Sequence, residues 1–396
     1  MSAPTDALLA PADQGARDAA TRAVVTAPVA TRPVRVGNVT LKTPLVVAPM
    51  AGMTDSAFRR LVKRQGGCGL VVTEMVSADG LVRGIDRTLE YAEYTEEERP
   101  VSIQIFGGDP AMMAAAAQII EGLGADIVDV NMGCPVHKIA KHHAGCSLMR
   151  EPEHAAAIIN AMAKAVRIPV TVKMRAGWND RERNAPELAR LVADAGAAAV
   201  TVHGRTAEQS YSGSADWDLV RRVRDAVNIP VFGSGDCVET GQILEKLAGG
   251  IDGVLVGRGV LRNPWILAQT ADAVAGRPVR QVSLQERGQF LLDYIDMLLR
   301  EGEAETAGFR HAAGLGAGGR SAHRNKEQWV VNKIRALCAW YTKGLEGGAG
   351  LRVTVNSALD LTSLRDEVGL FFFQGRPDQS SQSVTISPAA LPSRSS

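Results

Sequence analysis

The residues best suited to chemistry lie within or at the end of short apolar runs of the chain. Gln104, Asn131, Lys173 and His203 all occupy such positions. Their amide, amine and imidazole groups can bind a polar ligand and, in part, exchange protons with it. A single Lys or His there is usually a satisfied structural residue. Because all four share the same placement, the pattern favours a functional site.

Two glycine-rich turns follow the last two apolar runs. They read Gly233-Ser234-Gly235-Asp236 and Gly257-Arg258-Gly259. Glycine lets backbone N–H groups converge on an anion, and the start of a following helix adds a positive dipole. Arg258 adds a positive charge. The alternative is a pair of ordinary tight turns, but their position at the last two strands favours a phosphate site.

Cys134 follows the fourth apolar run, in a loop that begins Asn131-Met132-Gly133-Cys134-Pro135. A cysteine there is a nucleophile, a proton donor or an inert thiol. Its loop also carries the cationic side chains His137, Lys138, Lys141, His142 and His143. Metal binding by the histidines is a weak alternative, since no carboxylate pattern accompanies them. The other four cysteines are interpreted as structural.

The elements that must position these residues alternate between strand-like and helix-like patterns. The nearly continuous apolar runs are typical of strands buried on both faces of a parallel sheet. They are Leu45–Ala48, Leu70–Thr73, Val101–Ile105, Ile127–Asn131, Val170–Lys173, Ala199–His203, Val231–Ser234 and Gly253–Val256. Helical patterns between them include Ala111–Leu123, Glu153–Val166, Ala185–Ala195 and Glu239–Leu247.

Eight such strands predict an α/β fold of the (β/α)8 TIM-barrel type, with the active site at the carboxyl ends of the strands. An open doubly wound sheet is the alternative. No Gly-x-Gly-x-x-Gly follows the first strand, so the dinucleotide-binding version of that fold lacks its motif.

The barrel is predicted to span residues 34–276, after a disordered extension at 1–33. A small all-helical domain is predicted at 281–374, followed by a disordered tail at 375–396. Its helices are expected at Leu284–Leu299, Glu327–Thr342 and Ser357–Leu364, with a flexible insertion at Ala312–Ala322.

Composition narrows the classes of function. The net charge is +1, from 44 basic and 43 acidic residues. This balance excludes a protein coated with positive charge for nucleic acid, so any RNA contact must be local. The five cysteines form no Cys-x-x-Cys pair, and no apolar stretch approaches the roughly 20 residues that span a bilayer. We expect a cytoplasmic monomer that binds no metal and no membrane.

At these residues the chain resembles the tRNA-dihydrouridine synthases, and the bacterial B-type branch most closely. In the barrel, the resemblance rests on Pro49-Met50-Ala51-Gly52-Met53-Thr54-Asp55 with Phe58-Arg59, Gln104, the Asn131–Pro135 loop, Val172-Lys173-Met174-Arg175-Ala176-Gly177-Trp178, His203-Gly204-Arg205-Thr206, Ser234-Gly235-Asp236 and Gly257-Arg258-Gly259. Beyond the barrel it continues in Asn332-Lys333-Ile334-Arg335 and Trp340-Tyr341.

The resemblance implies an enzyme that reduces uridine in tRNA, with FMN as cofactor and NADPH or NADH as electron donor. Cys134 would be the catalytic acid. The residues that would hold FMN are Pro49, Met50, Ala51, Gln104, Lys173, His203, Ser234, Gly235, Asp236, Gly257 and Arg258. The residues that would bind RNA are Lys138, Lys141, Arg205, Lys333 and Arg335. The helical domain would grip the tRNA backbone.

The chain departs from the family pattern at three places. Ser234 stands where relatives often carry Asn, Ala336 and Leu337 fill a motif that is usually more basic, and Ala312–Ala322 is an insertion. Two rival functions remain: an FMN barrel oxidoreductase for a small molecule, such as a dihydroorotate dehydrogenase or an ene reductase, and a non-catalytic RNA-binding protein. A small-molecule oxidoreductase does not explain why the helical domain is basic. A non-catalytic RNA-binding protein does not explain why Cys134, Lys173 and His203 are all present.

Overall fold

Eight parallel strands close into a barrel in the computed structural model, which describes residues 32–136, 143–300 and 326–374. The closure is made by pairing of the second strand with the third, at Val71 with Val101 and Val72 with Ser102. In chain order the strands are β3 Leu45–Val47, β4 Leu70–Val72, β6 Val101–Phe106, β7 Ile127–Met132, β8 Val170–Arg175, β9 Ala199–His203, β10 Val231–Ser234 and β11 Gly253–Val256. They match the eight predicted strands, and the predicted TIM-barrel class is confirmed.

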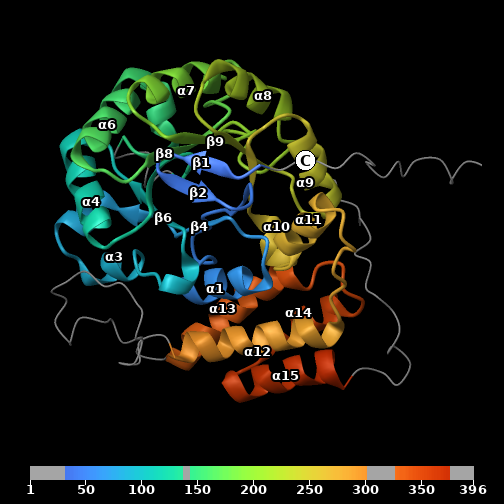
Figure 1. The fold of residues 1–396 in the computed structure, drawn as a ribbon. Coiled ribbons are helices and arrows are strands. Elements are labelled where there is room, and N and C mark those ends of the chain that lie inside the picture. The colour runs from blue at the N-terminus through green and yellow to red at the C-terminus, as the bar shows by residue number, and fades with distance from the viewer. Residues whose placement is uncertain (1–31, 137–142, 301–325, 375–396) are drawn as a thin grey trace, which may run out of the picture.

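Helices surround the barrel between successive strands (Figure 1). They are α1 Ser56–Gln65, α2 Ala78–Val82, α3 Asp86–Glu90, α4 Pro110–Gly122, α6 Pro152–Ala165, α7 Ala185–Asp194, α8 Trp217–Ala226, α9 Thr240–Ala248, α10 Arg258–Arg262 and α11 Ile266–Val274. Short 3-10 turns occur at Glu96–Glu98 and Gly145–Arg150, and a two-residue strand β5, Val76–Ser77, pairs with the end of β6.

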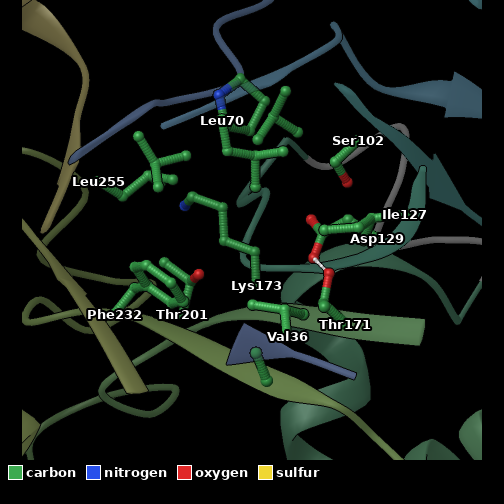
Figure 2. A pocket seen from close by; sticks show the side chains of 14 residues that line it. Val36, Leu70, Ser102, Ile127, Asp129, Thr171, Lys173, Thr201, Phe232 and Leu255 are labelled. Carbon is green, nitrogen blue, oxygen red and sulfur yellow. Dashed lines mark hydrogen bonds between the residues drawn. The ribbon is translucent and has the colours of Figure 1, made fainter. Parts of the chain in front are cut away.

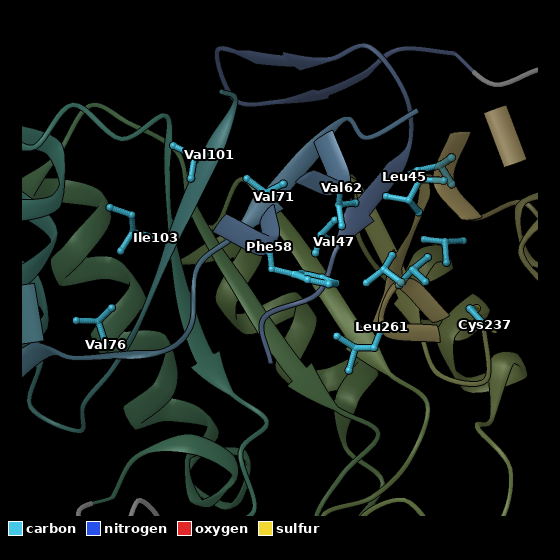
Figure 3. Packing of buried hydrophobic residues seen from close by; sticks show 14 of the residues in the cluster. Leu45, Val47, Phe58, Val62, Val71, Val76, Val101, Ile103, Cys237 and Leu261 are labelled. Carbon is cyan, nitrogen blue, oxygen red and sulfur yellow. The ribbon is translucent and has the colours of Figure 1, made fainter. Parts of the chain in front are cut away.

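Alternate residues of each strand divide the apolar side chains into two cores. In β3, Leu45 and Val47 belong to the core outside the barrel, whereas Val46 belongs to the core inside it. Figure 3 shows the outer core, where Phe58 and Val62 of α1 lie with residues of the neighbouring strands. This period of two is expected for a sheet that is covered on both faces.

A hairpin closes the amino-terminal end of the barrel. Strands β1, Val34–Val36, and β2, Val39–Leu41, pair antiparallel, and Val36 and Leu41 belong to the same core as Leu70 and Phe232 of the barrel interior. The turn contains Gly37 at φ +57°, where a Cβ atom would lie 2.8 Å from Pro169 Cγ. A Gly-Asn pair between two Val-rich runs is a hairpin signal that sequence reasoning missed.

The helices after the barrel pack against one another and against one side of it, and together they are called the helical layer. They are α12 Leu284–Arg300, α13 Lys326–Tyr341, α14 Gly348–Ser357 and α15 Leu361–Phe373. Helix α12 packs against α1 and α13 packs against α10, and in Figure 1 α15 lies farthest from the barrel. An aromatic cluster joins the two parts, because the ring of Phe58 contacts those of Phe290 and Tyr294 edge-on at 6.2 and 5.9 Å between centroids.

One predicted helix is wrong. The expected segment Ser357–Leu364 spans a break between α14 and α15, where Asp360 caps α15 by accepting a hydrogen bond from the backbone N–H of Ser363 at 2.8 Å. Asp and Ser at such spacing favour a helix start over a helix interior. The predicted insertion at Ala312–Ala322 lies outside the described residues, as do residues 1–31 and 375–396. Of the helices described, none combines the length and the apolar character needed to cross a membrane.

Candidate active site

A cavity opens at the carboxyl ends of β3 and β8–β11, and nine of the eleven predicted cofactor residues line it. They are Pro49, Met50, Lys173, His203, Ser234, Gly235, Asp236, Gly257 and Arg258. The cavity encloses about 580 Å³ when the space at its open mouth is included. The strand pairing explains the convergence, since Ser234 of β10 pairs with His203 of β9.

Lys173 and His203 lie in an unusually cationic part of this cavity. Burial, followed by the charge of Arg175, lowers the pKa of Lys173 to about 8. Burial lowers the pKa of His203 to about 2, and the charges of Lys173, Arg175, Arg205 and Arg258 act in the same direction. The imidazole is therefore neutral at physiological pH. An anionic ligand in the cavity would relieve the repulsion between these cations.

Arg205 is placed differently from the sequence expectation. Its side chain is 2% exposed and its guanidinium donates to both carboxylate oxygens of Asp236, at 2.7 and 2.9 Å, and to the carbonyl oxygens of Ser212 and Gly213. These four acceptors engage the guanidinium within the protein, and the RNA contact predicted for Arg205 stays a prediction. Arg205 holds Asp236 beside the cavity, and Asp236 in turn lies 3.6 Å from Arg258.

The two glycine-rich turns have the features of an anion cradle. Gly235 adopts φ +119° and Asp236 φ +53°, which turns the backbone back toward the cavity. Among the described residues, none accepts a hydrogen bond from the backbone N–H of Gly235 or of Gly257. Arg258 is partly exposed beside them, and such N–H groups together with a guanidinium suit an anion such as a phosphate.

Gln104 and Ala51 are not among the residues that line this cavity. Gln104 is 1% exposed and is held inside the barrel, where its Nε2 donates to Asp129 and its Oε1 accepts from Asn131. One amide hydrogen and one oxygen lone pair remain for a ligand. Ala51 is exposed in the loop after β3, next to Gly52, whose N–H donates to Glu74 at 2.6 Å.

Cys134 is half-buried in a loop that is fixed at three points. Asn131 Oδ1 accepts from the backbone N–H groups of Gly133 and Cys134, at 3.1 and 2.9 Å. Arg175 Nε donates to the Gly133 carbonyl oxygen at 2.8 Å, and the Cys134 carbonyl oxygen accepts from the N–H of Cys146 at 3.1 Å. The charges of both Lys173 and Arg175 are close enough to interact with that of the Cys134 thiolate.

The remaining predicted RNA contacts fall into two groups. Lys138 and Lys141 lie outside the described residues. Lys333 and Arg335 are engaged within the protein: Lys333 Nζ lies 2.9 Å from Asp55 Oδ2 and donates to the Gly52 carbonyl oxygen, whereas Arg335 donates to carbonyl oxygens at the end of α14. Lys333 thus joins the helical layer to the loop after β3.

Sequence reasoning missed three residues of the site. Arg175 clamps the Cys134 loop, and Tyr211 lines the cavity with its ring 5.2 Å from the Arg258 guanidinium. Asp129 lies buried beside Lys173 in the barrel interior (Figure 2). A lone aromatic residue in the polar segment Gln209–Gly213 was a usable signal for Tyr211. No group of three or more His, Cys, Asp or Glu side chains with the geometry of a metal site occurs in the part of the chain that the structure describes.

Comparison with known proteins agrees with this geometry. A probable tRNA-dihydrouridine synthase of Rickettsia prowazekii is 36% identical over 86% of this chain and 97% of its own length. The tRNA-dihydrouridine synthase B of Pseudomonas aeruginosa is 39% identical over 66% of this chain and 79% of its own. The barrel fold recurs in a histamine dehydrogenase from Rhizobium sp. 4-9, with a TM-score of 0.50 at 13% identity over 68% of this chain and 51% of that one.

The sequence profile described as "Dihydrouridine synthase (Dus)" matches residues 46–368, from the first barrel strand into α15. This span contains the cavity, the Cys134 loop and the helical layer, and the B-type relatives agree with the predicted branch. The chain belongs to the dihydrouridine synthase family.

Proposed function

We propose that this protein is a flavin-dependent oxidoreductase that reduces uridine in tRNA to dihydrouridine, with FMN as cofactor and NADPH or NADH as electron donor. The observation that carries the proposal is the convergence of Lys173, Arg258 and two free backbone N–H groups on one cavity, close to the Cys134 loop. Membership of the dihydrouridine synthase family and the names of its tRNA-modifying relatives support the choice of substrate.

The residues of the cavity fit FMN by charge. Arg258 and the N–H groups of Gly235 and Gly257 would hold its phosphate, and Lys173 would lie against the isoalloxazine ring. Once bound and reduced, FMN supplies the hydride for uracil C6. Cationic side chains near the ring stabilise the negative charge that a reduced flavin carries.

The proton for uracil C5 then has to come from the protein. His203 is a poor source, because its low pKa leaves the imidazole neutral and without an acidic proton at physiological pH. A cysteine thiol is among the side chains that can donate a proton in general acid catalysis. Cys134 is therefore the proposed general acid, and its loop presents the thiol near Lys173.

The target uridine must leave its base stack to reach a cavity at the mouth of a barrel. Lys138 and Lys141, in the loop that follows Cys134, are the proposed contacts for nearby RNA phosphates. Since Lys333 is held by Asp55, its proposed role toward RNA is indirect: it connects the helical layer to the loop that carries Met50 and Ala51.

The test compares the parent protein with Cys134→Ala, both loaded with FMN and supplied with NADPH and tRNA. Dihydrouridine in the tRNA is measured by mass spectrometry and flavin reduction by loss of visible absorbance. Loss of general acid catalysis typically lowers a rate by about 10²–10⁴-fold, so dihydrouridine formation should fall by about that factor while flavin reduction and tRNA affinity stay unchanged.

Three outcomes would overturn parts of the proposal. A Cys134→Ala variant that forms dihydrouridine at the parental rate removes the acid role from Cys134. A parent protein that reduces a free uracil or another small molecule and leaves tRNA unchanged makes the small-molecule oxidoreductase the correct function. Retention of flavin by both Lys173→Ala and Arg258→Ala would refute the placement of FMN in this cavity.

A further inference from the structure

A buried carboxylate stands at the centre of the barrel interior, and the proposed chemistry does not use it. Asp129 of β7 is 6% exposed. Its Oδ2 accepts from Gln104 Nε2 on β6 at 2.6 Å, and its Oδ1 accepts from Thr171 Oγ1 on β8 at 2.6 Å. Figure 2 shows Asp129 and Thr171 linked in this way to the right of Lys173. The pKa of Asp129 is raised above its ordinary value, because burial outweighs the two hydrogen bonds and the charge of Lys173, which act in the opposite direction.

The hydrogen bonds continue from this carboxylate to the Cys134 loop. Gln104 Nε2 donates to Asp129, and Gln104 Oε1 therefore faces Asn131. This oxygen accepts a hydrogen bond from Asn131 Nδ2 at 2.7 Å. Asn131 then presents its Oδ1 to the backbone N–H groups of Gly133 and Cys134. The register of the strands brings the Gln104 and Asp129 side chains together, because the two residues pair directly across β6 and β7.

The orientation of the two amides is set at both ends of this chain of hydrogen bonds. Both oxygens of Asp129 accept hydrogen bonds, from Gln104 and from Thr171. If Gln104 turned over, its oxygen would face Asp129 Oδ2 and its NH2 would face that of Asn131. If Asn131 turned over, its NH2 would face the two N–H groups of the loop. Asp129 therefore holds Gln104 in the orientation that receives Asn131, and the two backbone N–H groups hold the other end of Asn131.

We propose that Asp129 is a positioning residue for Cys134, acting through the side-chain amides of Gln104 and Asn131. The inference rests on the proposed role of Cys134 as the proton donor. Asp129 does not touch the substrate. It holds the Gln104 amide that receives the NH2 group of Asn131, and thereby supports the side chain that binds the backbone next to the thiol.

A double-mutant cycle with shape-conserving substitutions tests this chain of hydrogen bonds from Asp129 to the Cys134 loop, called the relay below. In Asp129→Asn, the introduced amide can accept from Gln104 and donate to the Thr171 hydroxyl, which can turn to accept. In Thr171→Val, Asp129 still accepts from Gln104. In the double variant nothing fixes the introduced amide, because the valine that replaces Thr171 offers no acceptor. Gln104 then loses its fixed acceptor, and the hydrogen bond by which it holds Asn131 is weakened.

Each single variant should lower the rate of dihydrouridine formation at saturating tRNA by less than about threefold. The rate reduction in the double variant should exceed the product of the two single-variant reductions by at least about tenfold. NADPH-driven flavin reduction should stay at the parental rate in all three. Alkylation of Cys134 by iodoacetamide, followed by peptide mass spectrometry, should become several-fold faster in the double variant alone. Ser102→Ala is the matched control, since Ser102 lines the same interior cavity and its buried hydroxyl has no hydrogen-bond partner among the described residues.

If the effects of the two single substitutions simply multiply in the double variant, for both dihydrouridine formation and the alkylation rate, the proposal is wrong. Residues that only fill space in the barrel would give that result, because packing alone does not link the two amides to Cys134. An Asp129→Asn variant as impaired as the double variant would show that the charge of Asp129, and not its acceptor geometry, matters. The alkylation rate needs no turnover. If the parent forms no dihydrouridine, the proposed function fails, while a faster alkylation in the double variant still supports the relay.

Discussion

Replacing Arg205 with Gln distinguishes its observed role from the RNA contact that its motif suggests. The substitution removes a guanidinium that is 3% exposed and leaves the Asp236 carboxylate without its bidentate partner. Removal of one partner from a fully buried ion pair costs about 3–5 kcal/mol. The Asp236 side chain is 34% exposed and keeps the N–H of Ala215 and the more distant Arg258. We therefore expect a loss of about 2–3 kcal/mol.

For a domain of this size each kcal/mol lowers Tm by roughly 2–4 °C, so Arg205→Gln should lower Tm by about 4–12 °C. Flavin affinity should fall as well, because the freed Asp236 draws Arg258 away from the phosphate. The slope of log K against log salt for tRNA binding should not change. Arg222→Gln, at an exposed position on α8, is the control and should stay within about 0.5 kcal/mol of the parent.

The opposite pattern would refute this reasoning. If Arg205 contacts an RNA phosphate, Arg205→Gln should leave Tm nearly unchanged and reduce the salt slope by roughly 0.7–0.9. Differential scanning calorimetry and tRNA titrations at several salt concentrations give both quantities on the same preparation.

Three further predictions follow from buried charges. The pKa of Lys173 is lowered to about 8, so between about pH 8 and its unfolded value of about 10.4 the unfolded chain binds more protons than the native protein. Stability of the flavin-free protein should therefore rise across this window, and denaturant titrations should show a smaller rise in Lys173→Met. Arg59→Leu should lower the free energy of unfolding by about 3–5 kcal/mol, because it leaves the fully buried Glu98 without its partner at 2.6 Å; an equally stable variant in urea titration contradicts this. Lys333→Met should lower stability by about 1–3 kcal/mol, since it leaves the mostly buried Asp55 without its ammonium partner; a loss of tRNA affinity at parental stability would instead restore Lys333 as a direct RNA contact.

The fold could be predicted because each barrel strand is encoded locally. Strands buried on both faces are short apolar runs, and the polar residues at their carboxyl ends mark the mouth of the barrel. Lys173 and His203 were recognisable in this way. The hairpin at residues 34–41 was missed because two three-residue strands give a weak periodic signal. The break at residues 358–360 was missed because its cap, Asp360, is flanked by Leu359 and Leu361, which continue the apolar pattern of a helix.

The partners of individual charged side chains could not be predicted. Arg205 and Lys333 lie in motifs that suggest RNA binding, yet their acceptors, Asp236 and Asp55, are distant in sequence. Asp129 was hidden for a similar reason: within an apolar strand it gives no sign that Gln104 and Thr171 come from the two neighbouring strands to satisfy it. Such pairings depend on strand register, which the sequence pattern alone does not supply.

The most direct test of the proposed function is a map of dihydrouridine in tRNA from cells that lack this gene, with the gene restored as the parent or as Cys134→Ala. The proposal predicts that at least one uridine is unreduced in the deletion strain, is reduced again with the parent gene, and stays largely unreduced with Cys134→Ala. A deletion strain with an unchanged dihydrouridine map, and a purified, flavin-loaded protein that leaves its tRNA unmodified, would contradict it.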